Sequence, residues 1–185
     1  QKHKIGVMFV LYDGVWDPYP QLGKQHAPRP GLHNSGWVQS PGVVILKNPD
    51  RYDELKEYVV GVVSHFRDDK RIDAWDLFNE PDNPNRSSYG KFEPANKPDL
   101  ALALLKKEIE WARSASPSQP LTAGVWSGDF TDEAKLSPIN RFMLDQSDVI
   151  SYHNYKPLPE MKRDVETLKR YKRPILCTEH MARPP

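Results

Sequence analysis

Ala74-Trp75-Asp76-Leu77-Phe78-Asn79-Glu80-Pro81 is the stretch that decides the fold, an apolar run that ends in an amide, a carboxylate and a proline. The run predicts a strand over 72–79 that is buried on both faces, as strands of parallel sheets are. A polar loop follows, and apolar residues then recur at helical spacing near 99–115. This unit of strand, loop and helix is the pattern from which the rest of the chain can be interpreted.

The same unit recurs along the whole sequence. Strands are predicted at 5–12, 72–79, 121–126, 149–155 and 174–178. Helices are predicted at about 49–68, 99–115, 139–144 and 159–171. Alternating strands and helices favour a parallel sheet with right-handed crossovers. The predicted fold class is therefore α/β, with about five parallel strands and four helices in a single domain over 1–185.

Composition excludes several classes of partner. A net charge of +1 gives no electrostatic reason to expect nucleic acid or an anionic membrane surface. No apolar run approaches the roughly 20 residues that span a bilayer. The single cysteine, Cys177, cannot form an intrachain disulfide. Because the chain begins at Gln1, we expect a processed or excerpted sequence, and the compartment stays open, a secreted or periplasmic bacterial location included.

Two glutamates follow strands directly. Glu80 ends the second predicted strand and Glu179 the fifth, 99 residues later. Ligands gather at the carboxyl ends of parallel strands, so the two side chains are expected to converge. A pair of carboxyl groups, one acidic and one ionised, is what hydrolysis of a glycosidic bond requires. The alternative for either glutamate alone is an ordinary helix cap or a lysine partner.

Three motifs together resemble one enzyme group. Residues 74–81 resemble the acid/base strand of the clan A glycoside hydrolases, particularly the family 5 cellulase-like enzymes. Residues 174–180 resemble their nucleophile strand, and 151–155 the strand before it. The stretch 7–41, which contains His33-Asn34-Ser35-Gly36-Trp37, is similar to bacterial 1,4-β-xylanases and cellulases. The resemblance implies a (β/α)8 TIM barrel of which this chain carries the third to seventh strands.

The resemblance also implies individual roles. Glu80 would be the acid/base and Glu179 the nucleophile. Asn79 would hydrogen-bond the sugar hydroxyl next to the anomeric carbon. Tyr155 would donate to Glu179, and His153 would line the same wall. For His153 and Tyr155 the alternative is core packing at a strand end.

Aromatic side chains near the strand ends are further candidates for sugar binding. Trp16 follows the first strand and Trp126 ends the third. An indole ring can stack on the C–H face of a sugar, although tryptophan also belongs to many cores. His180, beside Glu179, is expected either to reach the substrate or to position its loop.

The sequence contains no motif typical of a metal-binding or phosphate-binding site. The six histidines lack the HExxH spacing or a similar pattern, and the ten glycines form no phosphate-binding loop. We therefore expect neither a metal nor a cofactor.

The expected activity is endo-acting, retaining hydrolysis of a β-1,4-linked plant polysaccharide, whether glucan, xylan or mannan. Relative to a full barrel, two strands before Lys4 and one after Glu179 are missing. The alternative is thus an inactive truncated barrel that self-associates and at most binds a β-linked saccharide. Its apolar outer strands would present exposed edges, so a homo-oligomer is expected, unless the chain is an excerpt of a longer protein.

Overall fold

The computed structural model describes residues 3–31, 34–86 and 89–180, so His33 lies outside the described residues. The strands are β1 (Val7–Asp13), β2 (Ile72–Asn79), β3 (Leu121–Thr122), β4 (Ile150–Asn154) and β5 (Ile175–His180). The α-helices are α1 (Val43–Leu46), α2 (Lys56–Phe66), α3 (Lys97–Ser114), α4 (Pro138–Gln146) and α5 (Leu158–Leu168). The α/β class, the five parallel strands and the four main helices are as predicted; the short α1 within the long loop after β1 is additional.

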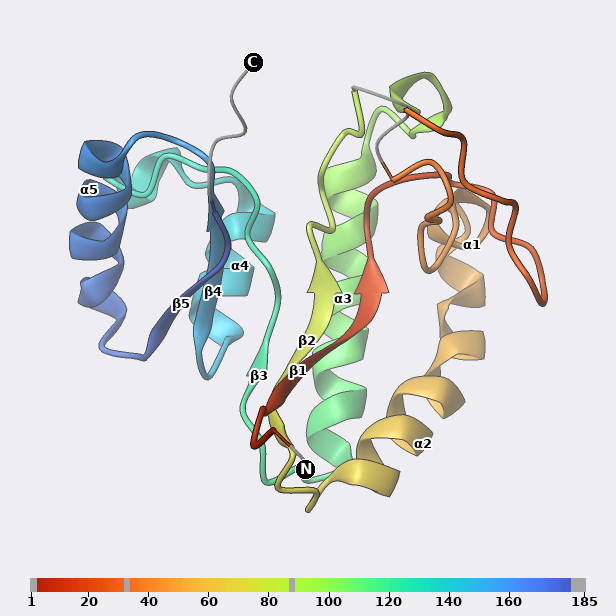
Figure 1. Cartoon of the computed structure of the whole chain (residues 1–185), viewed down its shortest axis with the longest axis horizontal. Helices are drawn as coiled ribbons and strands as arrows, with labels where there is room; N and C mark the ends of the chain where they lie inside the picture. Colours follow the sequence, from red (N-terminus) through yellow and green to blue (C-terminus); the bar gives the residue numbers. More distant parts are fainter. Residues whose placement is uncertain (1–2, 32–33, 87–88, 181–185) are drawn as a thin grey trace.

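The described strands pair in parallel and do not close into a barrel. β1, β2 and β3 form a three-stranded sheet, and β4 and β5 form a two-stranded sheet. A parallel bridge between Val125 and Tyr152 joins the two sheets. The carboxyl ends of the strands therefore face one side of the molecule, where the loops gather (Figure 1).

β3 is shorter than the predicted strand 121–126 because the backbone after Thr122 bonds elsewhere. Gly124 donates its N–H to the Asp76 carboxylate, and its carbonyl accepts from the Glu80 N–H at 3.0 Å. A Cβ at Gly124 would lie 2.7 Å from the side-chain oxygen of Asn79, so a larger residue here would require that side chain to shift. The interruption of the ladder thus lies directly beside the end of β2.

The helices bury the apolar face of the sheet. α2 and α3 lie beside β1–β3, whereas α4 and α5 lie with β4 and β5 (Figure 1). The fully buried large side chains form one core. They include Trp75, Leu77, Phe78, Leu104, Leu105, Ile139, Met143 and Tyr152. Ser137 caps the start of α4, and its hydroxyl accepts from the Asn140 N–H. Pro138 is the first residue of the helix, a position that proline favours.

β1 is a partly exposed edge strand of the three-stranded sheet. Val7, Phe9 and Val10 are between 42% and 47% exposed, although Leu11 and Tyr12 are buried. Within the described ranges, no helix is both long and apolar enough to cross a membrane.

Candidate active site

A cavity of about 430 Å³ opens at the carboxyl ends of the strands. Its walls combine carboxylates, amides and aromatic rings. The lining residues are Asp13, Val15, Trp16, Asn34, Trp37, Asn79, Glu80, Asn83, Asn85, Trp126, Tyr155 and Glu179. Apolar ring faces beside convergent polar groups are the composition that suits a small polar ligand with flat C–H surfaces.

Backbone geometry at the end of β2 positions Glu80. The residue has a φ of +46°, in the left-handed region that non-glycine residues seldom adopt. Gly14 packs against this turn, since a Cβ there would lie 2.3 Å from the Glu80 carbonyl oxygen. Such backbone strain persists where the surroundings enforce it, commonly at functional sites.

The Glu80 carboxylate is almost buried and makes two side-chain contacts. Oε1 lies 2.5 Å from His153 Nδ1, and Oε2 accepts from the Asn83 amide at 2.6 Å. His153 comes from β4 and Asn83 from the loop after β2. The carboxylate is therefore held from both sides.

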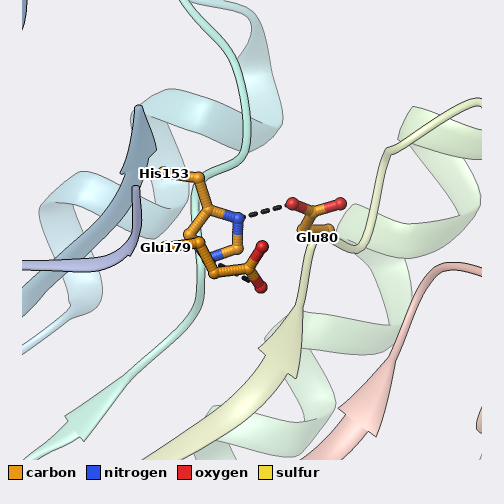
Figure 2. Close-up of side chains that lie close together, drawn as sticks. All are labelled: Glu80, His153 and Glu179. Carbon is orange, nitrogen blue, oxygen red and sulfur yellow. Dashed lines mark hydrogen bonds and ion pairs between the residues drawn. The ribbon is translucent and has the colours of Figure 1, made fainter. Parts of the chain in front are cut away.

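Glu179 approaches from β5 and completes the cluster. Its Oε2 accepts from the Tyr155 hydroxyl, and its Oε1 lies 3.6 Å from His153 Nε2. One carboxylate oxygen of Glu80, one of Glu179 and one ring nitrogen of His153 all lie within 4.8 Å of one another. Figure 2 shows that the imidazole contacts both glutamates, one through each ring nitrogen. Two carboxyl groups from distant parts of the chain thus share one site.

Burial and charge alter the pKa of several groups around the cluster. Burial by itself lowers the pKa of His153, but the hydrogen bond to Glu80 and the charges of Glu179, Glu80 and Asp76 outweigh it, so the net shift is upward. Burial raises the pKa of Asp13 to about 6 and that of Asp76 to about 7. The site therefore contains groups that can hold or release protons near neutrality.

A buried ion pair supports the loops around the cavity. Lys97, 2% exposed at the start of α3, donates to the Gly14 carbonyl at 2.5 Å and to the Asn83 carbonyl at 2.7 Å. Its ammonium lies 3.0 Å from the Glu93 carboxylate. Asn85 donates both to Glu93 and to the Trp16 carbonyl, and so extends the network to the cavity wall.

Six of the eight residues predicted for the site line the cavity: Trp16, Asn79, Glu80, Trp126, Tyr155 and Glu179. His153 lies at the junction of the two glutamates. His180 is exposed and is not among the described lining residues, because it alternates with Glu179 along β5. Trp126 donates its indole N–H to Asp82 at 3.0 Å, which fixes the ring.

Sequence reasoning missed polar residues at the end of β1 and in the loops. Asp13 accepts from the Asn79 amide at 3.2 Å, and Asn34, Asn83 and Asn85 contribute further amides to the cavity. Asp13 had a signal that could have identified it, since it follows an apolar strand as Glu80 does. The three asparagines had none, because only loop geometry directs them inward.

Comparisons with known proteins find partial structural likenesses. No family model matches the chain, and no curated protein does. A β-glucuronidase of Bifidobacterium dentium is similar over 73% of this chain, with 17% identity and a TM-score of 0.49. A β-1,4-mannanase of the sea hare Aplysia kurodai is similar over 62%, with 16% identity and a TM-score of 0.46. An endo-β-1,4-xylanase of Gloeophyllum trabeum is similar over 74%, with 17% identity and a TM-score of 0.44.

The likenesses cover only part of each structure. This chain spans 21% of the glucuronidase chain, 40% of the mannanase chain and 45% of the xylanase chain. At these identities the similarity concerns the arrangement of strands and helices and carries no information about substrate. The function has to be argued from the site itself.

Proposed function

We propose that this protein is a retaining glycoside hydrolase in which Glu179 is the nucleophile and Glu80 the acid/base. The proposal rests on one observation, the approach of a Glu80 oxygen and a Glu179 oxygen to within 4.8 Å. Retaining enzymes hold their two carboxyl groups roughly 5–5.5 Å apart, whereas inverting enzymes leave about 6.5–9.5 Å for a water molecule. The short separation favours double displacement.

The two reaction steps use each carboxyl group in turn. Protonated Glu80 gives its proton to the glycosidic oxygen as the bond to the anomeric carbon breaks, while ionised Glu179 attacks that carbon and forms an ester. Glu80 then takes a proton from water, whose oxygen attacks the same carbon and releases Glu179. The hydroxyl of Tyr155 keeps the Glu179 oxygen oriented for attack.

Glu80 must be protonated before the first step. In the free site it accepts from Asn83 and faces His153 Nδ1. Since the pKa of His153 is raised, the imidazole is the adjacent proton donor. We infer that His153 Nδ1 is the position from which a proton can reach the Glu80 carboxylate.

The cavity walls suit a neutral, β-linked plant polysaccharide such as glucan, xylan or mannan. Trp16, Trp37 and Trp126 offer ring faces for stacking, and Asn79 and Asp13 offer hydrogen-bonding groups for hydroxyls. A second candidate is saccharide binding without turnover. The open sheet favours it, because a cleft that is open on one side positions the glycosidic bond less firmly for reaction.

Hydrolysis should be measured on β-glucan, xylan, mannan and aryl β-glycosides, with Glu80→Ala and Glu179→Ala beside the wild type. Each variant should lose activity by roughly a thousand-fold, because each removes a group that acts in both steps. Added azide should then separate the roles. In Glu179→Ala, azide would enter the space left by the carboxylate, attack the anomeric carbon and give the α-glycosyl azide. In Glu80→Ala, azide would attack the glycosyl ester on Glu179 and give the β-glycosyl azide.

Glu110→Ala is the matched control, since Glu110 is an exposed glutamate of α3 away from the cavity. It should retain wild-type rates. Saccharide binding without hydrolysis by the wild type, unchanged in Glu179→Ala, would replace the enzyme proposal by the binding one.

A further inference from the structure

The wall of the cavity is acidic. Asp13, Glu80 and Glu179 line it, and none of the lining residues in the described ranges is a lysine or an arginine. Lys97 lies beneath the loops, where its ammonium is 3.0 Å from the Glu93 carboxylate and donates to two backbone carbonyls. The charge of Lys97 is thus matched by a carboxylate outside the cavity wall.

His153 adds a positive charge only where the two glutamates meet. Its Nδ1 faces Glu80, and its Nε2 lies 3.6 Å from a Glu179 oxygen. Because the pKa of His153 is raised, the ring holds a proton more readily than a free imidazole. A protonated ring balances one of the three carboxylate charges, so a ligand that carries a carboxylate would still meet net repulsion.

Asp13 is the lining carboxylate that the proposed reaction does not use. It ends β1, and its two oxygens accept from the Val15 N–H at 2.8 Å and from the Asn79 amide at 3.2 Å. Both donors are neutral. Glu80 enters the reaction protonated and Glu179 loses its charge when the ester forms, so Asp13 alone among the three keeps its charge through both steps.

We propose that Asp13 is a specificity-determining residue, whose carboxylate excludes sugars that carry a carboxylate of their own. The inference rests on the proposed function, because it concerns the saccharide that occupies the site. Two like charges about 5 Å apart, at an effective dielectric constant of about 20, repel strongly enough to lower affinity by at least about ten-fold. The preferred saccharide is therefore uncharged, and a uronic acid is rejected.

Three glycosides of one size test the exclusion: phenyl β-thioglucoside, the corresponding glucuronide and the corresponding glucuronamide. The sulfur link resists hydrolysis, so affinity can be measured by calorimetry, and the amide matches the carboxylate in size without its charge. At pH 7.5 the wild type should bind the glucuronamide about as tightly as the glucoside. It should bind the glucuronide at least about ten-fold more weakly.

Asp13→Asn should reduce the ratio of glucuronamide to glucuronide affinity at least about five-fold, because it removes the charge and keeps the shape. Asp145→Asn is the matched control, since it removes an exposed aspartate of α4 that does not line the cavity. The control should keep the wild-type ratio. Circular dichroism of both variants establishes that they are folded.

The wild type carries a second test that needs no variant. Burial above all raises the pKa of Asp13 to about 6, so this group gains a proton between pH 7.5 and pH 5. The glucuronide stays ionised over this range. The affinity ratio should therefore fall several-fold with a midpoint near pH 6, whereas in Asp13→Asn it should be nearly constant around that pH.

Other charged groups face Asp13 and are retained in the variant. They are Glu80 and Glu179 across the cavity, Asp76 on β2 and Lys97 on α3. The pKa of Asp76 is raised to about 7 and that of His153 is also raised, so both titrate at a higher pH than Asp13. The midpoint thus identifies the group even if Asp13→Asn does not fold.

Four results would overturn the proposal. They are equal affinity of the wild type for glucuronide and glucuronamide, tighter binding of the glucuronide, no binding of any of the three, and an unchanged ratio in folded Asp13→Asn.

Hydrolysis of the oxygen-linked aryl analogues is measured separately. If none is hydrolysed but the affinities behave as stated, selection by Asp13 stands and the hydrolase proposal falls. If the glucoside and the glucuronide are hydrolysed with equal kcat/KM, the hydrolase proposal stands and selection by Asp13 falls.

Discussion

At the scale of single residues, the raised pKa of Asp76 should make the free energy of unfolding depend on pH. It is 2% exposed beneath the site, and burial raises its pKa to about 7, while a backbone N–H of Gly124 and the charge of His153 lower it only in part. The unfolded chain releases this proton near pH 4. Between about pH 4 and pH 7 the folded state therefore holds a proton that the unfolded state has lost, and stability decreases as the pH rises.

Asp76→Asn removes this dependence. The difference in unfolding free energy, variant minus wild type, should rise by on the order of 4 kcal/mol from pH 4 to about pH 7. Above about pH 7 it should stay constant. Urea unfolding over this pH range measures the difference. Asp145→Asn changes an exposed aspartate and should give a flat difference; a flat difference for Asp76→Asn as well would contradict the assignment.

At the scale of elements, the start of α3 holds the loops after β1 and β2 in place. Lys97→Met would leave Glu93, whose side chain is 4% exposed, without its cation. Breaking one partner of a buried pair costs about 3–5 kcal/mol, so we expect a loss of that size in urea unfolding. The pair Lys107–Asp53 is exposed at 40% and 71%, and Lys107→Met should cost less than about 1 kcal/mol.

The same variant should also affect the cavity. Because Lys97 donates to the carbonyls of Gly14 and Asn83, its loss should loosen the loops that carry Trp16 and Asn83. If the measured loss of stability were no larger than that of Lys107→Met, the ion pair would not be the element that holds these loops.

At the scale of the whole molecule, the open sheet predicts self-association. Apart from a bridge from Asp13 to Ser40, β1 pairs only with β2 in the described ranges, and Val7, Phe9 and Val10 are partly exposed. Unpaired apolar edges attract other chains. Sedimentation velocity at tens of micromolar should give a mass above that of one chain.

Val10→Lys should shift that equilibrium toward single chains, since a charge on an edge strand disfavours pairing. Val44→Lys is the matched control, because Val44 is 52% exposed on α1 rather than on the sheet edge. A wild-type mass equal to one chain would show that β1 does not mediate association under these conditions.

The sequence by itself determined the order and type of the main elements and the two strand-end glutamates. Apolar runs and helical periodicity are local properties, and parallel strands place their carboxyl ends together whatever the details of packing. The tertiary structure alone decided that His153 lies between Glu80 and Glu179, that Lys97 is buried beneath the loops, and that the ladder breaks at Gly124. These features depend on distances between residues far apart in the chain, which no local pattern encodes.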